Sequence, residues 1–217
     1  MKWRPILFSA PMVRALLAGT KTQTRRALKP QPEAVHGGEP YWFVGGYRAW
    51  QHRSTDHVLR QGGNPLPCPY GEAGAGLWVR ETWAYHLHAA ASASDDAGPF
   101  VYAADGTTQY RLCDRWRPSI HMPRSASRIS LAVTAVRVER LQDISEADVI
   151  AEGGTEALRG WWTHEGLQWN DPGPNHRFGA TPIDSYRVLW ESINGPGSWD
   201  ANPWVWVVEF KRVEAGS

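Results

Sequence analysis

The stretch AGTKTQTRR (residues 18–26) joins a predicted helix to a predicted polar strand and decides how the fold is interpreted. Upstream of it, Pro11 stands where a helix can begin, the apolar residues that follow share one helical face, and Gly19 ends the helix. Downstream, side chains alternate from Thr22 to Leu28 as they do in a β-strand. The stretch therefore predicts a helix that ends in a glycine turn and is followed at once by a strand.

Working outward, further strands are predicted near both ends of the chain and in its middle. Apolar or alternating runs rich in β-branched and aromatic residues mark residues 5–9, 77–83, 129–141 and 203–213. Two later helices begin with capping boxes, formed by Ser145 with Asp148 and by Thr181 with Asp184. Strands outnumber helices, so we predict a mixed α/β, mainly β fold, in which a small β-barrel carries a few flanking helices.

Irregular stretches rich in Gly, Pro and aromatic residues separate these elements. We interpret the 217 residues as a single domain with insertions at about 30–70, 86–125 and 155–180. The chain has 13 Trp, an unusual number. Tryptophan can stack on bases, but most of these lie in strand-like or helical apolar patterns, so we assign the majority to packing.

Composition narrows the classes of partner and cofactor. A net charge of +1 does not favour duplex DNA or an anionic membrane. Cys68 and Cys113 lack a CxxC spacing, and no carboxylate or Cys completes a site around His86 and His88, so we expect no metal and no other cofactor. No signal-peptide pattern and no bilayer-length apolar run occurs, so we expect a cytoplasmic protein with reduced thiols and no membrane partner. The oligomeric state stays open.

Four segments resemble the ASCH superfamily, whose fold is a PUA-like β-barrel. Residues 18–26 resemble its defining motif, in which a helix ends in Gly, Lys follows, and a polar strand with Thr and Arg comes next. LWVRETW (77–83) resembles the second signature, ISEADVIAEG (144–153) resembles the helix that carries an acidic site residue, and WVWVVEF (204–210) is similar to the closing strand. With its insertions, the chain is similar to the larger ASCH variants common in phages and prophages.

The enzymatic branch that the sequence resembles is the N4-acetylcytidine amidohydrolases. That branch uses a Lys, a Thr three residues later and a Glu from a later helix, which implies Lys21, Thr24 and Glu152 as the catalytic residues. A threonine hydroxyl can attack the amide, a lysine of lowered pKa can take its proton, and the glutamate can hold the lysine or pass a proton to the leaving amine. The acidic position has neighbouring alternatives in Glu146, Asp148 and Glu156.

Five further residues are predicted to bind the substrate. Arg25 or Arg26 could steady the negative charge that develops during hydrolysis. Glu81, Trp83 and His121 are candidates for contacts to a base. For these three the alternatives are an ion pair between Glu81 and an arginine, core packing of Trp83, and a structural His121.

A basic stretch supplies a competing interpretation. Several arginines interleave with aromatic residues there, as in single-strand-binding surfaces, although a solvated face is an equal alternative: Arg111, Arg115, Arg117, Arg124 and Arg128 with Tyr110 and Trp116. The leading hypothesis is an amidohydrolase acting on N4-acylated cytidine or a related modified nucleoside. The alternatives are a non-catalytic PUA-like reader of RNA or modified DNA and an ASCH-type ribonuclease. The partner is then a nucleoside or a single-stranded nucleic acid. A reader needs the cleft and the arginines but not a perturbed Lys21, whereas the hydrolase needs Lys21, Thr24 and an acid to converge.

Overall fold

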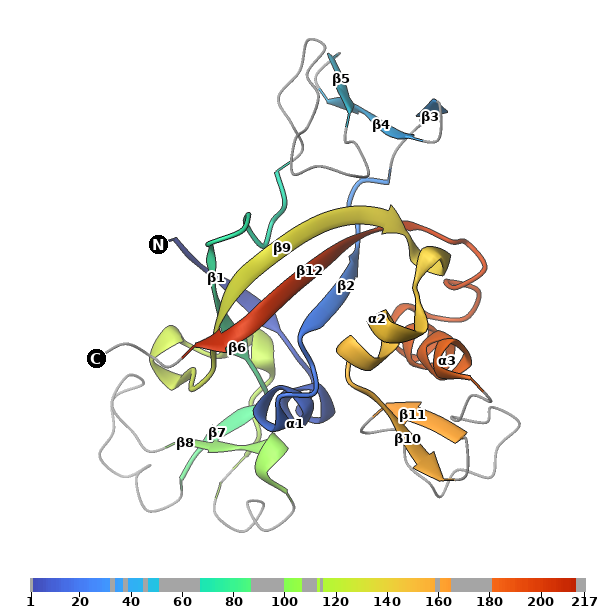
Figure 1. Ribbon diagram of the computed structural model, residues 1–217. Helices are drawn as coiled ribbons and strands as arrows, with labels where there is room; N and C mark the ends of the chain where they lie inside the picture. The colour runs from blue at the N-terminus through green and yellow to red at the C-terminus, as the bar shows by residue number, and fades with distance from the viewer. Residues whose placement is uncertain are drawn as a thin grey trace.

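The protein is a mixed α/β structure made mainly of strands, with three α-helices among the described residues (Figure 1). The computed structural model describes residues 2–31, 34–36, 39–44, 47–50, 67–86, 100–106, 113, 115–158, 161–164 and 181–213. Across those ranges, none of the helices has the length and apolar character needed to cross a bilayer. The expected mixed, mainly β class is confirmed.

A five-stranded sheet forms the centre of the molecule, with strand order β1-β6-β9-β12-β2. Its strands are β1 (Trp3–Leu7), β6 (Gly76–Arg80), β9 (Ser130–Arg140), β12 (Trp204–Val213) and β2 (Gln23–Ala27). β1 and β6 are parallel, and every other neighbouring pair is antiparallel. The long strands β9 and β12 run side by side across Figure 1, with β2 along the far edge of β12. Each strand corresponds to one of the five predicted from sequence, and all five belong to one sheet.

The two faces of β12 pack against different cores. Val208 and Phe210 join a cluster that includes Ile6 and Phe8, next to β1. Val205 and Val207 join a second cluster formed with α2 and α3. Because successive side chains of a strand point to opposite faces, one strand holds both cores together.

The three helices are α1 (Ala10–Ala18), α2 (Glu146–Ala151) and α3 (Pro182–Asn194). Gly19 ends α1 in the left-handed conformation with φ 77°, which a residue without Cβ adopts without strain. Both predicted capping boxes are present, at the starts of α2 and α3. α2 and α3 lie together on one side of the sheet, whereas α1 covers the end of β2 (Figure 1).

Smaller sheets lie in or beside the predicted insertions. They are formed by β3 (Ala34–His36), β4 (Glu39–Val44) and β5 (Tyr47–Trp50), by β7 (Trp83–Tyr85) with β8 (Phe100–Tyr102), and by β10 (Gly154–Leu158) with β11 (Trp161–His164). The interpretation of residues 155–180 as wholly irregular is therefore wrong at its start, where β10 and β11 form an antiparallel hairpin. Their side chains beyond residue 155 lie outside the described part.

The predicted strand over residues 77–83 is also corrected, because the chain leaves the main sheet at Glu81. β6 ends at Arg80 and β7 begins at Trp83, in a different sheet. At the break, the Glu81 amide donates to Sδ of Met122 at 3.3 Å, and Arg128 binds the Glu81 carboxylate. These tertiary contacts replace the ladder bonds that a continuous strand would make.

Candidate functional site

The link between α1 and β2 is joined to the end of α2 by backbone hydrogen bonds. The Thr22 amide donates to the Ala151 carbonyl at 2.8 Å, and Lys21 and Glu152 form an isolated antiparallel bridge. Lys21 is further fixed by its own amide, which donates to the Ala15 carbonyl at 3.2 Å. The glycine turn after α1 thus delivers Lys21 directly to Glu152, which stands at the C-terminal end of α2.

The side chains of this pair make a buried contact. Nζ of Lys21 lies 2.7 Å from Oε2 of Glu152 and 2.9 Å from the Glu152 backbone carbonyl oxygen, and the side chains are 1% and 4% exposed. Burial lowers the pKa of Lys21, the charge of Glu152 opposes this, and the neighbouring Arg26 and Arg25 lower it further. The lysine therefore gives up its proton more readily than a solvated one, while its amine stays oriented by two acceptors.

Arg25 lies at the centre of three carboxylates. Its Nη2 binds Oε1 of Glu139 and lies 3.2 Å from Oδ2 of Asp148, and its Nη1 lies 3.6 Å from Oε1 of Glu152. Burial alone would lower the pKa of Arg25, but Glu152, Tyr186 and the other carboxylates raise it. The guanidinium is therefore a fixed positive charge with no exposed surface.

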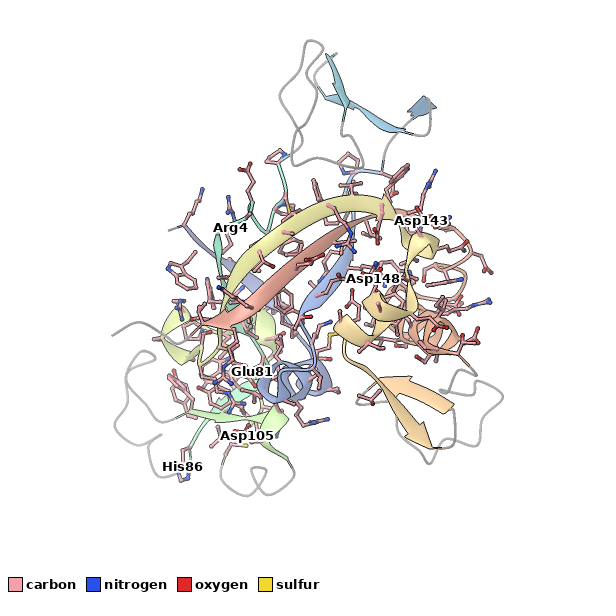
Figure 2. All side chains as sticks on the ribbon, viewed as in Figure 1. Arg4, Glu81, His86, Asp105, Asp143 and Asp148 are labelled. Carbon is pink, nitrogen blue, oxygen red and sulfur yellow. The ribbon has the colours of Figure 1, made fainter. Side chains whose placement is uncertain are left out.

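A second arginine extends this network toward the surface. Arg137 of β9 contacts Oε2 of Glu139 at 3.1 Å and Oδ1 of Asp148 at 2.9 Å, and it also pairs with Glu209 of β12. Figure 2 shows Asp148 on α2 between that helix and the strands. Two arginines from the sheet thus share carboxylates from β9 and α2, which docks α2 on β2.

Asp148 has a double role in this arrangement. Its carboxylate completes the α2 capping box with Ser145 and also accepts a hydrogen bond from Nε2 of Gln23 at 3.1 Å. Burial would raise the pKa of Asp148, but the hydrogen bonds from Ser145 and the charge of Arg25 outweigh it and hold the pKa well below its usual range. Asp148 is therefore a permanent anion near neutral pH, occupied by structural contacts.

A cleft opens where β2 faces α3, with α1 and the end of α2 closing its sides. Its lining residues come from those four elements: Met12, Thr24, Arg25, Arg26, Ala27, Glu152, Tyr186, Leu189, Trp190, Ile193 and Asn194. Four sequence-predicted residues are therefore brought together: Thr24, Arg25, Arg26 and Glu152. Lys21 is not among the lining residues but contacts Glu152 from behind.

Thr24 and Arg25 approach this cleft from opposite faces of β2. Arg25 pairs with Val207, whose side chain packs in the cluster with α3, whereas Thr24 pairs with Val208, which packs in the cluster with Phe8. Nζ of Lys21 lies 5.7 Å from the centre of the Phe8 ring. The hydroxyl of Thr24 and the amine of Lys21 therefore belong to the same side of the strand.

α3 supplies five cleft residues that were not predicted as site residues: Tyr186, Leu189, Trp190, Ile193 and Asn194. Tyr186 and Trp190 have the spacing of an apolar helical stripe, and both are buried in the cluster against the sheet. Burial strongly raises the pKa of Tyr186, and the negative charge of Glu152 adds to the effect. No sequence pattern distinguishes a stripe residue that lines a cleft from one that only fills a core.

Arg26 has contacts at the opposite edge of the sheet. Its Nη2 donates to the carbonyl of Leu7 at 2.6 Å, and its guanidinium lies 5.3 Å from the centre of the Phe8 ring. It lines the cleft together with Arg25. Of the two arginines, only Arg25 reaches the acidic cluster.

The other predicted substrate-binding residues, Glu81, Trp83 and His121, are not among those that line the cleft. Glu81 is buried and held by Arg128, with Nε to Oε1 and Nη2 to Oε2 both at 3.0 Å. Burial raises the pKa of Glu81, and Arg128 opposes the rise. Figure 2 shows Glu81 and Asp105 well away from Asp148.

Trp83 lies in an aromatic cluster and His121 on an exposed helix, and neither lines the cleft. Trp83 packs edge-on against Tyr85 and Phe100, with ring centres 5.2 Å and 5.4 Å away. His121 is exposed at the end of a short 3-10 helix, Ser119–His121.

Three arginines of the basic stretch stack on aromatic rings of the protein itself. The guanidinium of Arg117 lies 4.3 Å from the Tyr85 ring centre, that of Arg124 lies 5.4 Å from the Trp3 ring centre, and that of Arg128 lies 3.9 Å from the Tyr102 ring centre. Tyr110 and Arg111 lie outside the described residues. Arg117, Arg124 and Arg128 therefore already use their stacking faces, which does not favour them as a base-stacking surface.

Potential metal ligands and two cysteines also occur away from the cleft. Within the described ranges, no group of three or more His, Cys, Asp or Glu side chains is placed to hold a metal ion. Cys68 and Cys113 do not form a disulfide, and burial raises the pKa of the Cys68 thiol to about 11.

Comparison with family models, with curated proteins and with solved structures finds no match to this chain.

Proposed function

We propose that this protein is an amidohydrolase that removes an acyl group from the N4 nitrogen of cytidine or a related modified nucleoside. The single observation that carries the proposal is the buried contact of Lys21 with Glu152, at 2.7 Å, on the wall of a cleft that Thr24 also lines. A nucleophilic hydroxyl, an amine of lowered pKa and a carboxylate are the groups that amide hydrolysis requires.

In the first half-reaction, Thr24 Oγ1 attacks the acyl carbon as its proton passes to the neutral amine of Lys21. Arg25 stabilises the negative charge on the acyl oxygen. The C–N4 bond then breaks, and the proton moves from Lys21 through the Glu152 carboxylate to the departing N4. Cytidine leaves, and the acyl group remains as an ester on Thr24.

In the second half-reaction, water attacks the ester carbon and Lys21 takes a proton from it. The ester bond breaks, Thr24 recovers its hydroxyl hydrogen from Lys21, and the acid is released. Glu152 holds the Lys21 amine through Oε2 in both halves, and its other oxygen, Oε1, which lies toward Arg25, passes the proton to N4 in the first half.

We further propose that the fold is an ASCH-type, PUA-like barrel. The sheet is strongly curved (Figure 1), and its two edge strands, β1 and β2, are linked by the hydrogen bond from Arg26 to the Leu7 carbonyl. Side chains then close the barrel where ladder bonds are absent among the described residues. The resemblance of residues 18–26 and 144–153 to the ASCH motifs agrees with the contact between Lys21 and Glu152.

The lowered pKa of Lys21 favours the hydrolase over a non-catalytic reader. A reader of RNA or modified DNA needs a cleft but gains nothing from a buried lysine, whose desolvation disfavours the charged form that would bind phosphate. The ASCH resemblance also allows a ribonuclease. Beyond the cleft itself, no contact among the described residues supports that activity.

The test is release of cytidine from N4-acetylcytidine, followed by absorbance. Thr24→Ala and Lys21→Arg should each reduce kcat by about a hundredfold or more, because the first removes the nucleophile and the second replaces an amine with a guanidinium that keeps its proton. Thr22→Ala is the matched control, since Thr22 is exposed two positions away on the same segment. Equal turnover by the wild type and Thr24→Ala would refute the catalytic proposal, and ligand binding that survives in both would then favour the reader.

A further inference from the structure

Five buried polar atoms in residues that line the cleft have no hydrogen-bond partner among the described residues: Nε and Nη1 of Arg25, Nε of Arg26, Oε1 of Glu152 and Nε1 of Trp190. Arg26 is only partly buried, and the three buried residues each contribute one atom considered below: Nη1 of Arg25, Oε1 of Glu152 and Nε1 of Trp190. Their side chains are deeply buried, with Trp190 only 5% exposed. Buried polar groups in folded proteins nearly always have partners, so three together in one cleft require an explanation.

The three atoms have complementary chemistry. Arg25 and Trp190 each offer an N–H donor, and Glu152 offers a carboxylate acceptor. Nη1 of Arg25 and Oε1 of Glu152 are 3.6 Å apart, so one ligand can contact both atoms at once. A ligand that satisfies all three must carry a hydrogen-bond acceptor beside an N–H donor.

We propose that Trp190 is a specificity-determining residue whose indole N–H binds the acyl oxygen of the substrate together with Nη1 of Arg25, while Oε1 of Glu152 accepts the amide N–H. The cleft then selects a secondary amide. This inference rests on the proposed function for the identity of the amide, N4-acylcytosine, but the hydrogen-bonding pattern is read from the cleft itself.

The position of Trp190 suits this role. It lies on α3 opposite β2, and its ring is held by packing on Tyr186, with ring centres 6.3 Å apart. A donor fixed in this way need not reorganise as charge develops on the acyl oxygen. The apolar side chains of Met12 and Ile193 also line the cleft, and Ile193 is 56% exposed, which provides a surface for the alkyl part of the acyl group or a base face.

The experiment compares two ligands that differ in the acyl oxygen. N4-acetylcytidine carries the oxygen and the N–H, whereas N4-methylcytidine keeps the N–H and the ring but lacks the oxygen. Sites built around a hydrogen bond discriminate against ligands that leave it unmade. Calorimetric binding to the Thr24→Ala protein, which prevents turnover, should show a preference of about tenfold or more for N4-acetylcytidine.

Trp190→Phe, added to Thr24→Ala, keeps an aromatic ring and removes the N–H. It should weaken N4-acetylcytidine binding by about tenfold and leave N4-methylcytidine binding nearly unchanged. Trp204→Phe is the matched control, because Nε1 of Trp204 is also buried without a partner among the described residues but Trp204 does not line the cleft. It should leave the preference intact.

The outcomes separate this inference from the proposed function. One outcome is that N4-acetylcytidine is preferred over N4-methylcytidine only when Trp190 is present, but the wild type and Thr24→Ala show equal turnover. That outcome supports the inference and refutes the hydrolase. A second outcome is that turnover depends on Thr24 but the preference for N4-acetylcytidine is equal in Trp190→Phe and Trp204→Phe; this overturns the inference alone. The inference is also overturned if the Thr24→Ala protein binds neither ligand. If Trp190→Phe does not fold, the thioacetyl analogue replaces the variant: its sulfur accepts hydrogen bonds poorly, so equal affinity for both acyl ligands would overturn the inference.

Discussion

The ammonium of Lys21 contacts Glu152 through both its side chain and its main chain, at 2.7 Å and 2.9 Å. The second acceptor is a carbonyl and cannot be removed by substitution. Any change to the Glu152 carboxylate therefore alters the charge around Lys21 while one hydrogen bond continues to hold the amine in place. A substitution of Glu152 can therefore show how the charge next to Lys21 affects activity while the Lys21 amine keeps its orientation.

Glu152→Gln should reduce kcat for N4-acetylcytidine hydrolysis by at least about tenfold, because an amide cannot carry a proton from Lys21 to the leaving N4. The loss of negative charge should also lower the pKa of Lys21 further, since Glu152 is the main influence that raises it. Glu146→Gln is the control, because Glu146 is exposed on the first turn of the same helix. Equal rates for the two variants would exclude Glu152 from proton transfer.

The pH dependence of activity follows from Lys21. Only its neutral form accepts a proton, so kcat/KM should rise with pH and reach its plateau below the ordinary lysine value of 10.5. The linked effect on stability has the same sign: between the folded and unfolded pKa values the unfolded chain binds more protons, so the free energy of unfolding rises with pH there. A rate profile whose rising limb is centred at 10.5 would contradict a buried lysine base.

Glu139→Ala should destabilise the protein by about 3 kcal/mol, because it leaves the buried Arg25 without its nearest carboxylate. Asp200→Ala provides the comparison. Asp200 is 68% exposed on its side chain and lies 3.5 Å from Arg187, so its loss should cost less than about 1 kcal/mol. Chemical denaturation of both variants gives the two free energies of unfolding, and similar values would show that the Arg25 network contributes no more than a surface pair.

Gly153→Ala should impair both stability and activity. Gly153 has φ +96°, and an added Cβ would lie 3.2 Å from Cβ of Ala15 and 3.5 Å from Cβ of Lys21. The backbone strain alone costs about 1 to 3 kcal/mol. Gly74→Ala bears the same kind of strain, with φ +89°, but nothing lies within 4 Å of its Cβ. A fall in kcat for Gly153→Ala alone would show that crowding displaces Lys21, whereas equal activity of the two variants would contradict it.

Local sequence signals predicted the regular elements well because their causes are local. Gly19, the two capping boxes and the alternating strands depend on residues within a few positions of one another. The break at Glu81 could not be predicted, because the alternating pattern continues through it. Its cause lies in Met122 and Arg128, far along the chain.

The candidate site likewise contains residues that the sequence indicated and residues that only tertiary contacts reveal. Lys21, Thr24 and Glu152 were selected by resemblance to a motif, and the structure brings Lys21 and Glu152 into contact. Asp148 was predicted as a helix cap and as an alternative to Glu152, but its contact with Arg25 could not be predicted because it exists only when α2 docks on β2. Trp190 gave no signal, since the lack of a partner for its N–H is a property of packing rather than of sequence.

The contact between Lys21 and Glu152 spans 131 positions of the chain. Closing so long a loop is entropically unfavourable and occurs only when the intervening strands have paired. The helix and strand on either side of Lys21 can form early from local interactions. The amine nevertheless remains solvated, and therefore protonated, until α2 packs against it. Hydrolytic activity should therefore appear late during refolding, after far-UV signals have recovered, and a chain that ends before residue 152 should have none. Enzyme turnover would serve as a reporter of completed folding.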